Sequence, residues 1–163
     1  MKIGILSDTH SYMDDRILDH LRDCDQIWHA GDIGDIKVTD QLRTIAPLRA
    51  VYGNIDGGDI RREFPEHQIF EIEGVKVWMT HIGGYPPKYS KKMIPMLNKI
   101  RPKLFICGHS HILKVIPDKH REMLHVNPGA VGQHGFQKVR TMITMKIKEG
   151  RMYDMNVIEF ERP

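Results

Sequence analysis

The most constraining feature of this 163-residue chain is a series of short apolar runs that each stop at a polar side chain. The runs at 2–7, 26–30 and 48–52 have the length and composition of buried strands. Between them, apolar residues recur at helical spacing over 14–24 and 36–45. This alternation of strand and helix predicts a parallel sheet with helices packed on it.

The second half of the chain follows a different pattern. Runs at 67–72 and 75–80 flank Glu73-Gly74, which predicts a β-hairpin. A helix is predicted over 90–100, where Pro95 must start, kink or break it. The remaining apolar runs predict three strands and a terminal hairpin, at 103–107, 112–116, 123–126 and 141–148 with 152–160. These elements predict an α/β fold of two sheets packed face to face with helices outside, in a single domain over 1–163.

The charge distribution leaves two interpretations open. The net charge of +3 is too small to indicate a nucleic-acid partner by itself. However, the segment from Gly74 to Pro117 contains eight Lys and Arg residues and no Asp or Glu. This segment either attracts an anionic substrate or forms a solvated helix face.

The two cysteines, Cys24 and Cys107, are too few for a disulfide framework, which favours a reducing compartment. The apolar run at residues 3–6 is too short for a signal peptide. No stretch approaches the roughly 20 apolar residues of a membrane span. We therefore expect a cytoplasmic protein with no membrane partner.

Side chains able to bind metal follow one predicted strand after another. In chain order they are Asp8, His10, Asp32, Asn54, His81, His109 and His111. Ligands of open α/β sheets bind beyond the carboxyl ends of the strands. Each residue alone is also an ordinary turn, cap or structural residue, although the pair His109-x-His111 after Gly108 is more specific. Together they predict a site for one or two divalent ions.

The order of these residues resembles the five signatures of the calcineurin-like metallophosphoesterases: Asp8-x-His10, Gly31-Asp32, Gly53-Asn54-x-Asp56, Thr80-His81 and Gly108-His109-x-His111. The chain is most similar to the small bacterial and archaeal phosphodiesterase branch, which also includes a eukaryotic retromer subunit. The resemblance covers nearly the whole chain, including the run at 127–132. It implies a four-layer α/β/β/α sandwich of two mixed β-sheets flanked by helices.

The resemblance also implies an assignment of ligands. The first ion would be bound by Asp8, His10, Asp32 and His111. The second ion would be bound by Asp32, Asn54, His81 and His109, so that Asp32 bridges both ions and His109 lies near the substrate phosphate. Imidazole, carboxylate and amide ligands without a thiolate favour Mn²⁺, with Fe, Zn or Ni as alternatives.

These assignments predict a phosphodiesterase. Two ions about 3.5–4 Å apart can clamp an in-line displacement in which a hydroxide between them attacks phosphorus. The expected substrate is a small phosphodiester or a nucleotide-like molecule. Two alternatives stay open: a protein-interaction scaffold on the same fold, and a metal-dependent nuclease. The acid-free segment favours the nuclease, but no aromatic and basic residues interleave as in a base-stacking surface.

Two positions depart from the family pattern. Ile55 stands where many relatives have a His that serves as general acid, and Ile82 stands where relatives commonly have Gly. Because Ile55 cannot donate a proton, we expect weak activity on alkyl phosphomonoesters and better activity on diesters with good leaving groups. Two further histidines have two interpretations each. His29 is a core residue or orients a ligand, and His134 is a loop residue or reaches the substrate phosphate.

Overall fold

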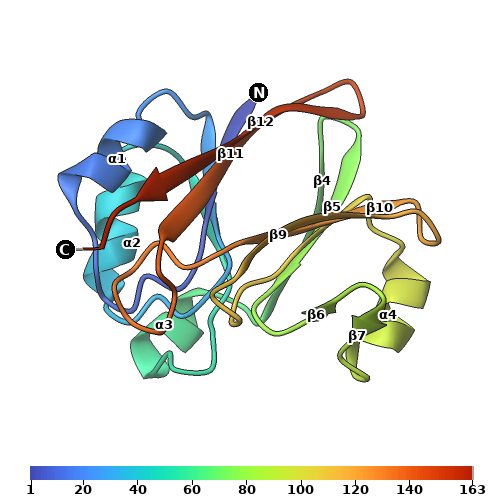
Figure 1. Ribbon diagram of the computed structural model, residues 1–163, viewed down its shortest axis with the longest axis horizontal. Coiled ribbons are helices and arrows are strands. Elements are labelled where there is room, and N and C mark those ends of the chain that lie inside the picture. Colours follow the sequence, from blue (N-terminus) through green and yellow to red (C-terminus); the bar gives the residue numbers. More distant parts are fainter. Residues whose placement is uncertain (163) are drawn as a thin grey trace.

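The computed structural model describes residues 1–162, which form two five-stranded mixed sheets (Figure 1). The first sheet has the order β12-β11-β1-β2-β3. Its strands are Arg151–Phe160, Arg140–Lys148, Lys2–Leu6, Gln26–His29 and Leu48–Ala50. Strands β1, β2 and β3 are parallel to one another, whereas β11 and β12 pair antiparallel.

The second sheet has the order β4-β5-β8-β10-β9. Its strands are His67–Ile72, Val75–Thr80, Leu104–Ile106, Met123–Pro128 and Leu113–Asp118. Here β5, β8 and β10 are parallel, and the edge strands β4 and β9 pair antiparallel. Each sheet thus contains three parallel strands whose carboxyl ends lie at one edge, where a site can form.

Apolar side chains separate the layers of the molecule. Ile5 and Trp28 of the first sheet pack with Ile106 of the second in the central layer. The outer face of the first sheet is covered by α1, α2 and α3, at Asp15–Leu21, Ile36–Arg43 and Gly58–Glu63. The outer face of the second sheet is covered by α4, Met93–Ile100 (Figure 1). This helix packs on Trp78 and Phe105. The predicted four-layer α/β/β/α sandwich is therefore confirmed.

The helix boundaries follow local capping. The Asp14 carboxylate accepts the N–H of Ile17 at 2.9 Å, so α1 begins one residue later than predicted. The Asp35 side chain accepts the N–H of Lys37 at 2.9 Å and caps α2 in the same way. Pro95 is the third residue of α4, where a backbone N–H has no partner within the helix. Of the three possible effects of Pro95 on the helix, the first is therefore observed: the proline lies where the helix starts.

Two small elements were not predicted. Helix α3 has six residues and a single buried one, Ile60, so it shows no helical period in the sequence. The ribbon of β6, Gly84–Tyr85, and β7, Lys88–Tyr89, has only two residues per strand. Among the residues described, no helix is long and apolar enough to cross a bilayer.

Candidate metal centre

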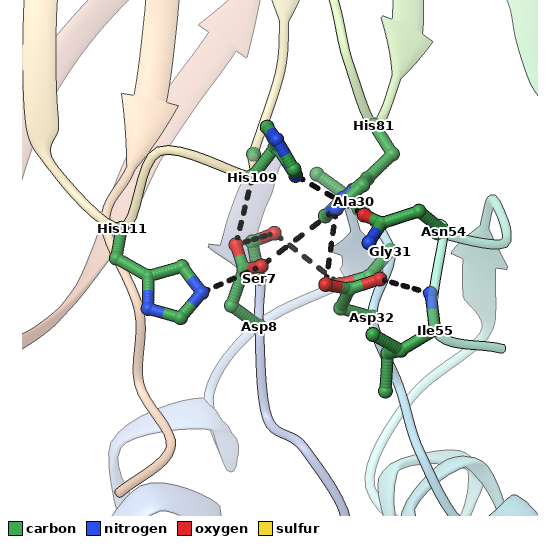
Figure 2. Close-up of polar contacts among 12 residues, drawn as sticks. Ser7, Asp8, Ala30, Gly31, Asp32, Asn54, Ile55, His81, His109 and His111 are labelled. Atoms are coloured by element: carbon green, nitrogen blue, oxygen red, sulfur yellow. Dashed lines mark hydrogen bonds and ion pairs between the residues drawn. The ribbon is translucent and has the colours of Figure 1, made fainter. Parts of the chain in front are cut away.

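The predicted ligands meet at one edge of the sandwich, beyond the parallel strands of both sheets. Figure 2 labels all of them except His10. Asp8 follows β1, Asp32 follows β2 and Asn54 follows β3, all from the first sheet. His81 follows β5 and His109 follows β8, both from the second sheet. The site is therefore assembled across the interface between the two sheets.

The ligand atoms form two groups, each with atoms within 4.8 Å of one another. The first group is Asp8, His10 and His111, and the second is Asp32, His81 and His109. Asn54 joins the second group, because its Oδ1 lies 3.1 Å from His109 Nδ1. The structure thus brings together all seven residues that the sequence singles out.

Asp32 belongs to the second group but also faces the first. Its Oδ2 is 3.3 Å from His10 Nε2 and 3.2 Å from His81 Nε2. Its Oδ1 instead accepts the N–H of Ile55 at 3.1 Å. A single carboxylate oxygen, Oδ2, therefore faces both groups, rather than one oxygen facing each.

Asp8 is fixed in orientation by its other oxygen. Asp8 Oδ2 accepts the Ser7 hydroxyl at 2.6 Å and the N–H of His109 at 3.1 Å (Figure 2). Asp8 Oδ1 consequently points to the centre, 3.2 Å from His111 Nε2 and 3.8 Å from His81 Nε2. Ser7 was not predicted to contribute, because a serine inside an apolar run carries no specific signal.

Three buried polar atoms at the centre, Asp8 Oδ1, His10 Nε2 and His81 Nε2, make no hydrogen bond of good geometry among the described residues. Their nearest polar neighbours are other donors of the same centre, at 3.2–3.9 Å. Leaving a buried polar atom without a partner costs about 1–3 kcal/mol. All three are atom types that bind divalent metal, and they face the same space. The residues present therefore fit a divalent cation at this centre.

The pKa values show charge compensation within the centre. Burial opposes ionisation of Asp32, but the contacts with His81, the N–H of Ile55 and His10 together outweigh it, so the pKa of Asp32 is lowered. For His81 burial lowers the pKa, and the contacts with Asp32 and Asp8 outweigh it, so the pKa is raised. The Asp8 carboxylate raises the pKa of His111 despite burial. Binding of cations is therefore expected to displace protons from these imidazoles.

Five of the seven residues have left-handed backbone conformations. The φ angles are 56° at Asp8, 43° at His10, 56° at Asp32, 75° at His109 and 62° at His111. This region costs a residue with a Cβ roughly 1–2 kcal/mol. Such outliers cluster at functional sites, where the surrounding structure imposes them.

Hydrogen bonds to the far ring nitrogens orient the imidazoles. His81 Nδ1 lies 2.7 Å from the carbonyl oxygen of Ala30, and His111 Nδ1 lies 3.1 Å from Gln137 Oε1. Each acceptor requires a proton on Nδ1 and leaves Nε2 free to bind a cation. Gln137 was missed, because this contact joins residues 26 positions apart and no local pattern marks it.

Asp56 anchors the backbone around the centre instead of acting as a ligand. Its buried carboxylate accepts the N–H groups of Ile33 at 3.1 Å, Gly34 at 2.8 Å and Gly53 at 2.7 Å. These bonds join the loop after β2 to the loop after β3. Asp56 therefore fixes the relative position of the two loops that carry Asp32 and Asn54.

The histidines with two interpretations lie beside the centre. His29 is fully buried, and burial lowers its pKa to about 4. It accepts the N–H of Gly31 at Nδ1 and contacts Thr9 Oγ1 at Nε2, each at 3.1 Å, so it supports the ligand loops without contacting a ligand directly. The His134 ring stacks on His10, with centroids 4.6 Å apart. That His134 reaches a substrate phosphate stays a prediction.

A cavity of about 540 Å³ opens above the centre. Among the residues that line it are His10, Asp32, Asn54, His109 and His111, together with three apolar side chains, Ile55, Ile112 and Phe136. Within residues 1–162, no Lys or Arg lines this cavity. The segment from Gly74 to Pro117 therefore lines the cavity with His109, Ser110, His111 and Ile112, but not with its Lys and Arg side chains.

This fold and this cluster of carboxylates and imidazoles define a class of metal-dependent phosphoester hydrolases. The match to a family model is direct: residues 1–150 match the calcineurin-like phosphoesterase superfamily domain. The chain belongs to this superfamily.

Individual relatives agree with the family assignment. The chain is 31% identical over 137 residues to a probable metallophosphoesterase of Methanothermobacter thermautotrophicus, covering 80% of this chain and 77% of that protein. Its fold is similar to that of Vps29 from Entamoeba histolytica complexed with Zn²⁺, with a TM-score of 0.77, 16% identity and 99% of each chain covered. A structure described as a novel archaeal phosphodiesterase has a TM-score of 0.73 and 23% identity, covering 97% of this chain and all of that chain.

Proposed function

We propose that this protein is a phosphodiesterase that uses two divalent metal ions. The observation that carries the proposal is the set of unpartnered buried atoms, Asp8 Oδ1, His10 Nε2 and His81 Nε2, around one carboxylate oxygen of Asp32. Two divalent ions bound there would supply hydroxide at neutral pH and would neutralise charge on the phosphoryl oxygens. Asp32 would help to hold both ions, because its Oδ2 faces His10 and His81 while its Oδ1 accepts the N–H of Ile55.

The ligand assignment follows the two groups of donors. Asp8, His10 and His111 would hold the first ion with Asp32. The second ion would be held by Asn54, His81 and His109 with Asp32. The two sets together contain all seven predicted ligands. The donors include no thiolate, which favours Mn²⁺, with Fe, Zn or Ni as alternatives. We place the reaction in the cytoplasm, because Cys24 and Cys107 are buried and form no disulfide.

The protein side chains position the substrate and stabilise charge. His109 is exposed and lines the cavity beside Asn54, so its imidazole faces the space that a phosphoryl group would occupy. An imidazole there stabilises the negative charge that grows on a phosphoryl oxygen during the displacement. The backbone N–H of His109 is directed to Asp8, so this residue also couples the two halves of the centre.

Two alternatives are less well supported. A nuclease needs cationic side chains along the substrate path, and none lines the cavity. An interaction scaffold has no need of seven donors at one edge of the sandwich, three of which have buried atoms without a hydrogen-bond partner. We therefore favour a small phosphodiester as substrate.

Hydrolysis of bis-p-nitrophenyl phosphate with saturating Mn²⁺ tests the function. We expect turnover by the parent protein, with a loss of at least about 100-fold in Asp32→Ala and His109→Ala, because each removes a charge-stabilising group. The matched controls are Asp40→Ala and His120→Ala, which change exposed residues outside the cavity. If the two site variants are as active as the parent, the activity belongs to another site or to a contaminant.

Ile55 provides a test of substrate class. The side chain lines the cavity and cannot protonate a leaving group. We expect a higher kcat/KM for bis-p-nitrophenyl phosphate than for p-nitrophenyl phosphate, and little hydrolysis of alkyl monoesters. Ile55→His restores a proton donor and is expected to raise alkyl monoester turnover by about tenfold or more. A parent enzyme that prefers monoesters contradicts this reasoning.

A further inference from the structure

Three large apolar side chains stand exposed around the mouth of the metal centre. Phe136 is fully exposed, and Ile112 and Ile55 are 56% and 46% exposed. They come from three separate loops, after β10, β8 and β3, yet all three line the same 540 Å³ cavity. We call these three residues the apolar rim. Exposed apolar groups that converge on one cavity mark a binding surface, whereas scattered ones do not.

The loop that carries Phe136 is anchored on both sides. Arg162 donates from Nη1 to the carbonyl oxygens of Gly135 at 2.9 Å and Gln137 at 2.6 Å. On the other side, Gln137 Oε1 contacts the ligand candidate His111 at 3.1 Å. The phenyl ring is therefore presented to solvent by a fixed backbone that is tied to the metal centre.

The chemistry of the cavity limits what can lie against the rim. Its floor is the candidate metal centre, which would hold the phosphoryl group. Among the described residues no Lys or Arg lines its walls, so a second phosphate or a carboxylate on the substrate would find no permanently charged side chain to pair with. An aromatic ring such as Phe136 binds another planar ring by stacking, and the two isoleucines extend the apolar surface.

From this arrangement we infer that the substrate carries a planar aromatic group that packs against Phe136, Ile112 and Ile55 while its phosphoryl group lies over the metal centre. This inference rests on the proposed function and specifies its substrate class. The occupant is the organic part of the substrate itself, because the rim and the metal centre share one cavity. A nucleobase and a simple aryl group share this chemistry.

Calorimetric titration of the Mn²⁺-loaded protein with three monoesters tests the inference. Methyl phosphate, phenyl phosphate and thymidine 5′-monophosphate each carry one phosphoryl group, so affinity differences report on the organic group attached to it. We expect phenyl phosphate to bind about tenfold tighter than methyl phosphate, the range of one stacking contact. Thymidine monophosphate binding at least as tightly as phenyl phosphate identifies a nucleobase as the occupant, and weaker binding identifies a simple aryl group.

Variants assign the effect to the rim. Phe136→Ala is expected to reduce the phenyl-to-methyl affinity ratio to about twofold, and Phe136→Tyr to restore it, since a ring is kept. Ile112→Asn removes a second apolar side chain of the rim, also at an exposed position. The matched control is Tyr153→Ala on β12, an exposed aromatic residue that does not line the cavity.

The inference and the proposed function fail in different ways. If bis-p-nitrophenyl phosphate is hydrolysed but phenyl and methyl phosphate bind equally, the apolar rim does not select the substrate and the function stands. A ratio that is unchanged in Phe136→Ala also overturns the inference. If no diester is hydrolysed and methyl phosphate does not bind, the function fails, and the inference fails with it.

Discussion

At the scale of single residues, the side chains that hold the centre in place matter as much as the candidate ligands. Asp56 accepts three backbone N–H groups and so joins the two ligand loops of the first sheet. Gln137 orients His111, and Ser7 orients Asp8. These residues contribute through hydrogen bonds that no short sequence motif contains.

Replacement of Asp56 tests its anchoring role. Asp56→Ala leaves three N–H groups without their acceptor, which is expected to lower the free energy of unfolding by about 3 kcal/mol or more. Asp56→Asn keeps one oxygen acceptor and is expected to lose less. Urea unfolding in EDTA measures both without metal effects. The control is Asp59→Ala, whose exposed ion pair with Arg62 contributes at most about 1 kcal/mol. Equal losses in Asp56→Ala and Asp59→Ala would rule out the anchoring role.

At the scale of elements, the prediction succeeded where a local pattern fixes an element and failed where it does not. Short apolar runs, continuous in the inner strands and interrupted by polar residues in strands such as β4 and β12, identified the ten strands of the two large sheets. The helix α3 and the β6–β7 ribbon are too short to show a period. The ligand residues were predictable because they directly follow strands, whereas the contact from Gln137 to His111 depends on tertiary folding.

Strand β10 carries a buried histidine outside the metal centre. His125 packs against Phe105 and Tyr89, and its Nδ1 has no hydrogen-bond partner. Burial lowers the pKa of His125 to about 4; the charge of Lys114 lowers it further and that of Asp118 opposes this. Between pH 6.5 and about 4 the unfolded chain therefore binds a proton that the folded protein does not, so stability falls as the pH is lowered through this window.

The variant His125→Phe tests this dependence. Between pH 7 and pH 5 the free energy of unfolding should fall by up to about 2 kcal/mol less in the variant than in the parent, since one pKa unit corresponds to 1.36 kcal/mol. Part of the pH dependence should remain, because His29 has a similarly lowered pKa. Urea unfolding of parent and variant in EDTA at both pH values measures the difference. His120→Gln, at an exposed position, serves as control, and a variant whose loss equals that of the parent contradicts the expectation.

At the scale of the whole molecule, the candidate centre joins the two sheets. Asp8, Asp32 and Asn54 follow strands of the first sheet, whereas His81 and His109 follow strands of the second. The same interface is otherwise held by the apolar layer between the sheets. Ions bound at the centre would therefore connect the two sheets through polar ligands, in addition to the apolar layer that already lies between the sheets.

Thermal unfolding with and without Mn²⁺ tests this connection. A ligand at 100 times its Kd stabilises the folded state by about 2.7 kcal/mol per site. For a chain of this size that corresponds to a rise in Tm of roughly 5–10 °C. The rise should vanish in EDTA and be strongly reduced in Asp32→Ala, but persist in Asp40→Ala. A Tm that does not respond to Mn²⁺, or that responds equally in Asp32→Ala, is inconsistent with a centre that spans the sheets.

The left-handed backbone at five of the seven candidate ligands has a consequence for directed evolution. Glycine and asparagine tolerate that conformation better than histidine does, so at positions such as His10 and His111 they relieve local strain. A library selected only for heat resistance in the presence of a chelator should accumulate glycine and asparagine at these positions. Selection for durability alone would thus erase the metal centre, and a thermostable version of this protein has to be sought with metal and substrate present.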